Sequence, residues 1–288
     1  MGLDVAALSI CAAGCLGLSL VLTQLGLRIV TPLRGACISV PSTTAALLML
    51  SPAMLDTSSF DASGALLFAL SGCLFPAVVT LLTFEANRRV GPSVTGALGN
   101  LSPLFAILIA FLVLGEVPRL GQLAGVGVIL TGVLLIIGAP RSMPRHAFGW
   151  AIALLLVAAI IRGLVQPVVK LGLVFWPNAF AATLISYLMS ATMILSVGAA
   201  REGAQIVPAW RVGWRWFVPI GLLNGVAVLT MYAALARGPV AVVAPLVACY
   251  PLATLAFSRL LLGSASLAWS AAIGVGVTVV GVALLLLA

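Results

Sequence analysis

The stretch Leu82–Pro92 reads LTFEANRRVGP, and the stretch Leu229–Pro239 reads LTMYAALARGP. Each is followed by a long apolar run that contains prolines, then by a glycine, and then by a helix-forming segment with several glycines. The chain therefore carries two copies of one unit. Each copy has five apolar runs long enough to cross a bilayer. Because five is an odd number, the second copy must cross the membrane in the opposite direction to the first.

The composition is that of an integral membrane protein. Hydrophobic residues make up 63% of the chain and charged residues 7%, against about a quarter charged in soluble domains, and the mean hydropathy is +1.28. A membrane-spanning helix needs about 20 apolar residues. Ten runs meet this length, near 6–27, 36–55, 64–84, 93–114, 120–139, 148–169, 179–200, 216–235, 240–260 and 267–287. We expect an all-α polytopic membrane protein with ten transmembrane helices, arranged as two inverted five-helix repeats over residues 1–140 and 147–288.

The basic residues lie mainly on one side of these ten runs. One side collects ten arginines: Arg28, Arg34, Arg88, Arg89, Arg141, Arg145, Arg201, Arg211, Arg215 and Arg259. The other side has only Arg119, Lys170 and Arg237, and Arg162 lies inside a run. By the positive-inside rule, the arginine-rich side is cytoplasmic and both termini are outside. The high pI thus reflects membrane topology, and nucleic acid is not expected as a partner.

Several other classes of site are not expected. The N-terminus lacks a basic segment before a small-residue cleavage site, so Ala6–Leu27 is predicted to be a retained helix. All five cysteines fall in apolar runs without C-x-x-C spacing, which indicates neither disulfides nor metal. His146 is the only histidine, and the six acids are scattered. We therefore predict no metal, no cofactor and no enzyme activity.

The duplication extends beyond the opening motif. Gly17 falls on Gly163 at an offset of 146 residues, and Pro103 on Pro251 at 148. The glycines of the fifth and tenth runs, Gly125, Gly127 and Gly132, match Gly274, Gly276 and Gly281 at 149. Offsets that drift by only three residues imply small turn insertions. The two units therefore share one fold.

At this level of detail the chain resembles an EamA-type member of the drug/metabolite transporter superfamily. The resemblance is carried by GALGNLSPLF at residues 96–105, by Leu114-Gly115-Glu116, and by the glycine-rich fifth helix. It implies ten helices around a central cavity that opens to one side at a time and is lined mainly by helices 1, 3, 4, 6, 8 and 9. Two departures stand out. Gly263-Ser264 replaces the expected Gly-Glu, and family members commonly keep both termini in the cytoplasm, whereas the arginines here place them outside.

Arg162 is the leading candidate for a substrate contact. An ionised side chain in hydrocarbon costs about 2.5–3.5 kcal/mol even on the lenient scale, so it needs a reason. Arg162, Gln166 and Lys170 recur at spacing four and share one face of the sixth helix. This stripe suits a carboxylate, a phosphate or another anionic or zwitterionic group. The alternative is structural: Lys170 snorkels to the outer interface, and Arg162 caps carbonyls freed near Pro167.

Glu85 is the acid nearest to the interior of a run. A carboxylate there is a candidate proton-coupling group, because partial desolvation raises its pKa. The alternative is a local ion pair, since Arg88 and Arg89 follow at spacings of three and four. Both interpretations fit the sequence.

The fourth and ninth helices carry matching proline-containing segments. Asn100, Ser102 and Pro103 lie near the bilayer middle, and Pro245, Tyr250 and Pro251 take the equivalent region. A proline frees a backbone carbonyl, and freed backbone groups at membrane depth are tolerated beside protein or a wet cavity. Pro103, Pro245 and Pro251 are therefore candidate hinges, and the polar residues are candidate ligand contacts. Structural kinking alone explains any single position equally well.

Three further polar residues complete the candidate cavity. Asn224 and Tyr232 lie eight residues apart on one face of helix eight, and Gln24 in helix one matches Lys170 under the repeat. The alternative for each is a helix-to-helix hydrogen bond. The small-residue spacings of the fifth and tenth helices favour close helix packing, and they leave the choice between monomer and homodimer open.

The combined interpretation is a secondary active transporter in a bacterial cytoplasmic membrane. It would move a small metabolite, such as an amino acid or organic acid, by alternating access, and the family resemblance favours export. Two alternatives remain: a lipid-carrier flippase of the same fold, which needs a lateral opening, and a membrane scaffold that transports nothing.

Overall fold

A computed structural model describes the chain over residues 3–99, 101–137, 145–203, 206–262 and 269–287. Within these ranges every regular element is a helix. The elements are α1 (Leu3–Gly26), α2 (Pro32–Met54), α3 (Ala62–Gly72), the π-helical turn η1 (Cys73–Val78), α4 (Val79–Gly99), α5 (Ser102–Leu114), α6 (Leu120–Ile137), α7 (Arg145–Phe175), α8 (Ala179–Glu202), α9 (Ile206–Arg237), α10 (Val240–Val247), α11 (Tyr250–Leu262) and α12 (Trp269–Leu287). The predicted all-α fold is confirmed.

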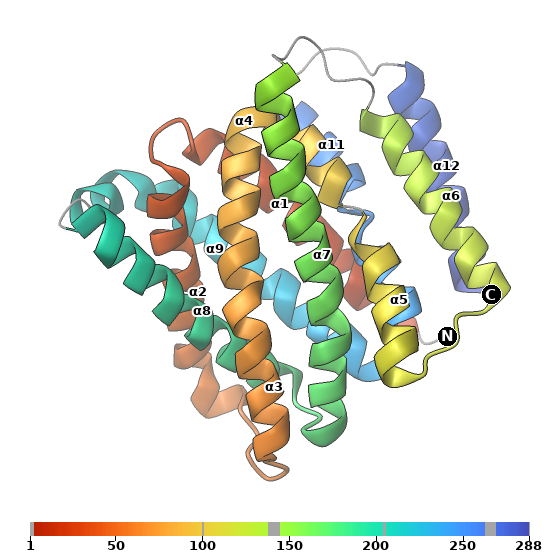
Figure 1. Cartoon of the computed structure of the whole chain (residues 1–288), viewed down its shortest axis with the longest axis horizontal. Coiled ribbons are helices and arrows are strands. Elements are labelled where there is room, and N and C mark those ends of the chain that lie inside the picture. Colours follow the sequence, from red (N-terminus) through yellow and green to blue (C-terminus); the bar gives the residue numbers. More distant parts are fainter. Residues whose placement is uncertain (1–2, 100, 138–144, 204–205, 263–268, 288) are drawn as a thin grey trace.

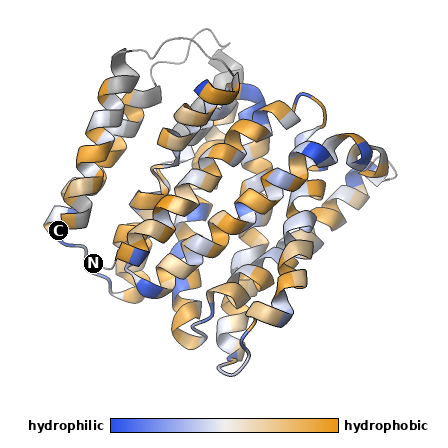
Figure 2. Ribbon diagram, turned by 180° about the vertical axis from the view of Figure 1, so that it is seen from behind, coloured by the Kyte–Doolittle hydropathy of each residue, from blue (hydrophilic) through white to orange (hydrophobic). Residues whose placement is uncertain are grey.

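The described helices make ten passes, as the sequence predicted. Seven helical stretches are apolar and long enough to cross a bilayer, two shorter apolar helices begin at Ser102 and Leu120, and α12 supplies the last pass. Apolar residues follow most of these helices along their length (Figure 2). α4 serves two passes, because Gly91 turns the chain within it at a φ of +76°. Only glycine adopts that conformation without strain.

The fourth and ninth passes are each broken in the middle. The fourth consists of the end of α4 followed by α5, and the ninth consists of α10 followed by α11. At the breaks, the amide of Leu101 donates to the carbonyl of Leu98 at 3.2 Å, and the amide of Cys249 donates to the carbonyl of Leu246 at 3.1 Å. These tight i to i−3 bonds occupy equivalent positions of the two repeats. Broken helices of this kind place irregular backbone at membrane depth, which requires protein or water around it.

The prolines explain where the second part of each broken pass begins. Pro103 lies in the first turn of α5, and Pro251 lies in the first turn of α11. A proline is favoured there because its missing N–H is not needed and its φ already suits a helix. Pro245 instead lies inside α10, near its end. Two of the three candidate hinges therefore start a helix after a break.

Close packing at the breaks repeats in both halves. A Cβ on Gly17 of α1 would lie 2.7 Å from the backbone nitrogen of Thr254 in α11. A Cβ on Gly163 of α7, the residue equivalent to Gly17, would lie 2.8 Å from the carbonyl oxygen of Ser102 in α5. A real Cβ atom does not fit at either distance, so glycine is required for these helices to approach. The matched contacts show the internal symmetry at the level of single residues.

The last helix of each half pairs with its counterpart. α6 and α12 lie side by side at one edge of the molecule (Figure 1). A Cβ on Gly132 of α6 would lie 2.5 Å from the nitrogen of Thr278, and one on Gly281 of α12 would lie 2.6 Å from the nitrogen of Ile129. These glycines therefore serve intramolecular packing between the halves.

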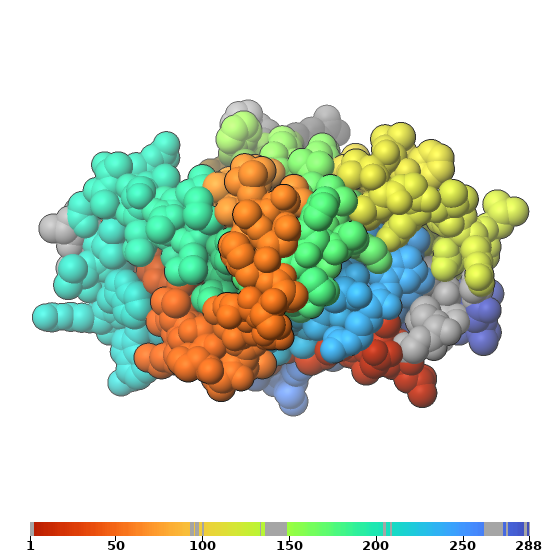
Figure 3. Space-filling model, turned by 90° about the horizontal axis from the view of Figure 1, so that it is seen from below, coloured from red at the N-terminus to blue at the C-terminus, as the bar shows by residue number. Residues whose placement is uncertain are grey.

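Elsewhere the two halves interleave. α1 and α2 pack on α9, and α3, α4 and α5 pack on α7. The start of α1 and the end of α12 lie on one side, together with the turns after α2, α5, α7 and α9 (Figure 1). The turns that carry most of the arginines lie on the opposite side, which we call the arginine-rich face. Figure 3 views the arginine-poor face, where atoms of α3 and α7 lie side by side across the centre.

Polar residues fix the helix starts on the arginine-poor face. The carboxylate of Asp61 accepts from the amide of Gly64 at 2.8 Å, and the side chain of Asn178 accepts from the amide of Ala181 at 2.9 Å. Both residues are N-caps, which typically contribute about 1 kcal/mol each. In the loop that joins α2 to α3, the Ser58 amide donates to the Asp56 carboxylate. This bond holds the pKa of Asp56 below its ordinary value.

Candidate functional site

A cavity lies between the two halves, where the broken passes meet α1 and α7. Its volume is about 60 Å³, which is room for a few water molecules. All six passes expected from the resemblance contribute to it, and Tyr187 adds α8. The lining residues are Leu16, Ser19, Leu20, Thr23, Phe75, Pro76, Val79, Thr80, Thr83, Phe84, Thr95, Gly99, Leu155, Ala158, Ala159, Arg162, Tyr187, Asn224, Val228 and Tyr250. About half of them are apolar, and the polar side chains among the rest determine what the cavity can bind.

Arg162 supplies the cavity with a cation. Its guanidinium carbon lies 5.9 Å from the centre of the Phe75 ring and 6.0 Å from that of the Tyr250 ring. The Tyr250 hydroxyl is its hydrogen-bonding partner. The ion pairs found in the described part of the chain do not include Arg162. Aromatic faces attract a cation by about 0.5–2 kcal/mol without neutralising it, so Arg162 retains the capacity to bind an anion.

Three buried polar atoms around this cavity lack protein partners. They are Nε of Arg162, Oγ1 of Thr95 and the hydroxyl of Tyr187. Thr95 is 2% exposed and Tyr187 is 1% exposed. Buried polar groups nearly always find a hydrogen-bond partner, and each one left without costs about 1–3 kcal/mol. Three such atoms facing one cavity indicate that a ligand or ordered water completes the site.

Asn224 joins the two halves at the cavity wall. Its Oδ1 accepts from the Ser19 hydroxyl at 2.7 Å, which links α9 to α1. The same hydroxyl lies 3.1 Å from the Leu16 carbonyl, and Thr23 donates to the Ser19 carbonyl at 2.7 Å. Asn224 therefore both lines the cavity, as predicted, and makes the helix-to-helix bond that was its alternative.

The third pass contributes a break that the sequence analysis missed. Phe75 has non-helical dihedrals (φ −137°, ψ 126°), and both Phe75 and Pro76 line the cavity. Ser190 of α8 satisfies the backbone there: its hydroxyl donates to the Gly72 carbonyl at 2.6 Å and accepts from the Ala77 amide at 3.1 Å. The proline in the middle of an apolar run was the available signal. Tyr187 and the cavity threonines were also missed, because hydroxyl residues are common in packed membrane helices.

A second, larger opening lies next to the cavity on the arginine-rich face. This recess has a volume of about 350 Å³ and is lined by Gln24, Leu27, Arg28, Asn87, Arg88, Arg89, Val90 and Gly91. Thr23 and Phe84 of the cavity lie within one helical turn of Gln24 and Asn87. Gln24 therefore belongs to the recess, and the recess lies close to the cavity on the arginine-rich face.

Lys170 lies outside the cavity lining, although it shares a helix face with Arg162. Its Nζ is 3.1 Å from Oε1 of Glu116 and donates to the Gly238 carbonyl. A largely buried amino group needs a counter-charge, and Glu116 supplies one, so the Lys170 side chain points to Glu116 rather than to the cavity. Gln166, on the same face, is 2% exposed and also lies outside the lining.

The remaining predicted contacts pack against protein. Tyr232 is fully buried in the hydrophobic core, and Ser102 is 3% exposed beneath Gly163. Neither lines the cavity. Asn100 lies outside the described residues. Of the nine predicted substrate contacts, the structure thus brings three together at the cavity: Arg162, Asn224 and Tyr250.

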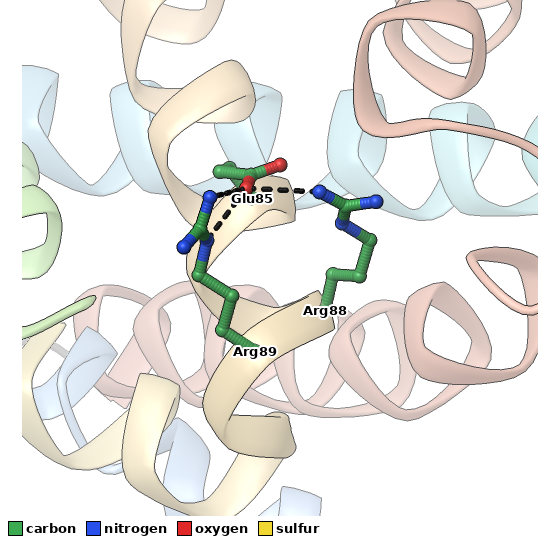
Figure 4. Close-up of polar contacts among 3 residues, drawn as sticks. All are labelled: Glu85, Arg88 and Arg89. Carbon is green, nitrogen blue, oxygen red and sulfur yellow. Dashed lines mark hydrogen bonds and ion pairs between the residues drawn. The ribbon is translucent and has the colours of Figure 1, made fainter. Parts of the chain in front are cut away.

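Glu85 lies in a local ion pair (Figure 4). One carboxylate oxygen is 3.1 Å from Arg88 Nη2 and 2.6 Å from Arg89 Nη2. This is the alternative that the spacing indicated. Exposed pairs of this kind contribute little stability, and proton coupling through Glu85 stays a prediction.

Among the described residues there is no group of three or more His, Cys, Asp or Glu that could hold a metal ion. The five cysteines are all free. The lining of the cavity offers a cation, hydroxyls and an apolar wall to a ligand.

Fold and site together define a multi-pass helical membrane protein with two repeats around a central cavity. The model of the EamA-like transporter family matches residues 5–138 and 149–287, so the chain belongs to this family. This confirms the resemblance seen in the sequence, and it makes the chain a membrane transporter of the drug/metabolite type.

A solved structure agrees with the fold. It is described only as "Crystal structure of protein", and it superposes with a TM-score of 0.75 at 19% identity, covering 98% of this chain and 96% of that chain. At this identity the likeness shows the fold alone. No curated protein sequence matches the chain.

Proposed function

We propose that this protein is a secondary active transporter that moves a small carboxylate-bearing metabolite, an amino acid or organic acid, through the central cavity by alternating access. The observation that carries the proposal is Arg162: a guanidinium inside the membrane that lines the cavity without an acid beside it in the described residues. A cation at that depth is expensive and marks a substrate pathway in many membrane proteins.

The geometry supports a ligand with one charged end and an apolar body. The guanidinium can donate two parallel hydrogen bonds to a carboxylate, an arrangement that is strong and specific. The unpartnered hydroxyls of Thr95 and Tyr187 offer hydrogen bonds to further polar groups of the ligand. Leu16, Val79 and Val228 supply apolar wall. Because the free volume is about 60 Å³, below the 300 Å³ or more of typical ligand pockets, this conformation must widen to admit a solute.

The membrane orientation follows from the arginines. We infer from the positive-inside rule that the arginine-rich face is cytoplasmic and that both termini are outside, and we propose that the membrane is the cytoplasmic membrane of a bacterium. The recess then opens to the cytoplasm, where a solute for export would enter.

The first experiment identifies the solute. Metabolite profiles of cells with and without the protein are compared, and the strongest candidates are tested for flux in vesicles reconstituted with the purified protein. We expect an amino acid or organic acid to accumulate in cells that lack the transporter. Movement of a lipid-linked carrier instead would overturn the proposal in favour of a flippase, and no flux of any solute would favour a scaffold.

The second experiment tests Arg162. Arg162→Ala leaves a buried carboxylate without its partner, a change that costs about 2–5 kcal/mol, so flux at limiting solute should fall about 30-fold or more. Arg237→Ala removes an exposed arginine from the arginine-poor face and serves as the matched control. Wild-type flux through a normally inserted Arg162→Ala protein would refute the anion site.

A further inference from the structure

The two ends of the transport path differ in one cluster of contacts. On the arginine-poor face, Lys170 of α7 pairs with Glu116 at 3.1 Å, and Oε2 of the same carboxylate accepts from the Val240 amide at 2.8 Å. Lys170 also donates to the Gly238 carbonyl. Glu116 belongs to the first repeat, whereas the other three residues belong to the second. The cluster therefore ties the two halves together on the arginine-poor face.

The charged side chains of this cluster are shielded from solvent and have partners. The side chains of Lys170 and Glu116 are 20% and 19% exposed, so the pair is largely shielded from solvent. Val240 is the first residue of α10, and Pro239 before it makes no side-chain cap. Glu116 thus caps a helix of the other half, where the positive end of the helix dipole also favours a carboxylate.

The internal repeat shows what stands at the opposite end. Gln24 is equivalent to Lys170, and Gly91 is equivalent to Gly238. Serine replaces Glu116 at the equivalent position of the second half, residue 264, which lies outside the described residues. Neither a lysine nor a glutamate is present in the sequence to form the same pair there.

The structure at that end is open. Gln24 and Gly91 line the recess of about 350 Å³, and Oε1 of Gln24 is buried without a partner. The arginine-rich face does hold another pair between the halves, Arg34 with Glu202 at 2.7 Å. That pair joins α2 to α8, neither of which lines the recess.

We propose that Lys170, Glu116 and the Val240 amide form a latch that holds the arginine-poor end of the path closed. The unlatched end, at Gln24 and Gly91, is then the one that opens in the resting protein. The proposal goes beyond transport itself to the device that selects the resting state, and it rests on the proposed function only in treating the recess and cavity as one path.

Hydrogen exchange followed by mass spectrometry tests the latch without a substrate. The wild-type protein in lipid nanodiscs is compared with Lys170→Gln and Glu116→Ser, each of which installs the residue of the other repeat. Exchange is measured in peptides over residues 238–244, which contain the latched amide of Val240. Coupling energies of this kind correspond to about 5- to 150-fold shifts, so we expect at least a fivefold faster exchange in both variants.

Two conservative variants and one control sharpen the test. Lys170→Arg keeps the pair and should exchange as the wild type does, and Glu116→Gln keeps an acceptor for Val240 but loses the charge, so its exchange should be intermediate. Arg237→Gln removes the exposed Asp4–Arg237 pair, 3.8 Å long on the same face, and should change nothing in residues 238–244.

The outcome decides the latch separately from transport. Wild-type exchange in a folded Lys170→Gln protein overturns the latch, whatever the vesicle assays show. Equal acceleration in Arg237→Gln also overturns it, because the effect would then be general loosening. Selective acceleration in Lys170→Gln and Glu116→Ser supports it, even if the solute of the transporter proves to be of another class.

Discussion

Replacing Gly99 by alanine should disturb the cavity through a single methyl group. Gly99 ends α4 at the break in the fourth pass, and a Cβ there would overlap the Tyr250 hydroxyl and lie 3.6 Å from Nη1 of Arg162. Tyr250 is 6% exposed, so its ring has little room to retreat. The methyl must therefore either remain in a strained contact or displace the Tyr250 hydroxyl, which is bonded to Arg162.

The size of the effect follows from two contributions. Extra atoms in a packed interior cost about 1–3 kcal/mol, and losing a hydrogen bond to a charged group costs about 1.5–3 kcal/mol. Only one of these two terms applies in full, because moving Tyr250 relieves the overlap while it breaks the hydrogen bond to Arg162. We expect Gly99→Ala to lose about 1–3 kcal/mol of stability, measured by denaturation in detergent, with a fall in solute affinity of about 5- to 100-fold.

A double-mutant cycle isolates the contact. Tyr250→Phe deletes the hydroxyl and makes room for the methyl, so the double variant Gly99→Ala/Tyr250→Phe should be more stable than the sum of the single effects by about 1 kcal/mol or more. Gly14→Ala is the control, since a Cβ on Gly14 meets nothing within 4 Å. Simple additivity within about 0.3–0.5 kcal/mol would show that the methyl and the hydroxyl do not meet, and the reasoning would fail.

Four further variants, at three positions, are compared with the wild type by thermal unfolding in the same detergent. Ser190→Ala leaves the Gly72 carbonyl at the third-pass break without its partner, so we expect a loss of about 1–3 kcal/mol; an unchanged melting temperature would show that water replaces the hydroxyl. Asn178→Ala removes the cap of α8 and should cost about 1 kcal/mol, whereas Asn178→Asp should retain it. Glu85→Gln should change stability by less than about 1 kcal/mol, because its arginine partners are exposed; proton-driven flux that survives this change would remove Glu85 as the coupling group.

The repeat and the sites of irregularity in the fourth and ninth passes could be predicted because they leave marks in residue type. Prolines in the middle of apolar runs are costly in a continuous helix, and Pro103 and Pro251 fall at equivalent positions, so matching hinges or kinks were expected there. That the helices break at these sites was not predicted. The third-pass break has no counterpart in the second half, where α9 is continuous. A single proline, Pro76, did not indicate whether the helix bends or breaks.

The polar stripe on the sixth helix shows the limit of spacing arguments. Arg162 and Lys170 share a face, as residues eight apart do, yet they lie about 12 Å apart along the axis. On α7 the cavity lining runs from Leu155 to Arg162, so Arg162 borders the cavity and Lys170, two turns further along, does not. Lys170 lies near the helix end, where Glu116 from the other half is its partner. Periodicity gives the direction of a side chain, whereas depth and the neighbouring helix decide what it meets.

Symmetry explains why such a pair can matter for the whole transport cycle. In a protein of two inverted repeats, the state open to one side becomes the state open to the other when the halves exchange conformations. Identical halves would give the two states equal free energy. A preference for one state over the other must therefore come from positions where the repeats differ. Lys170 and Gln24 occupy such a position, one in each repeat. A difference of about 1–3 kcal/mol there favours one state by about 5- to 150-fold, which leaves the other state populated enough for turnover.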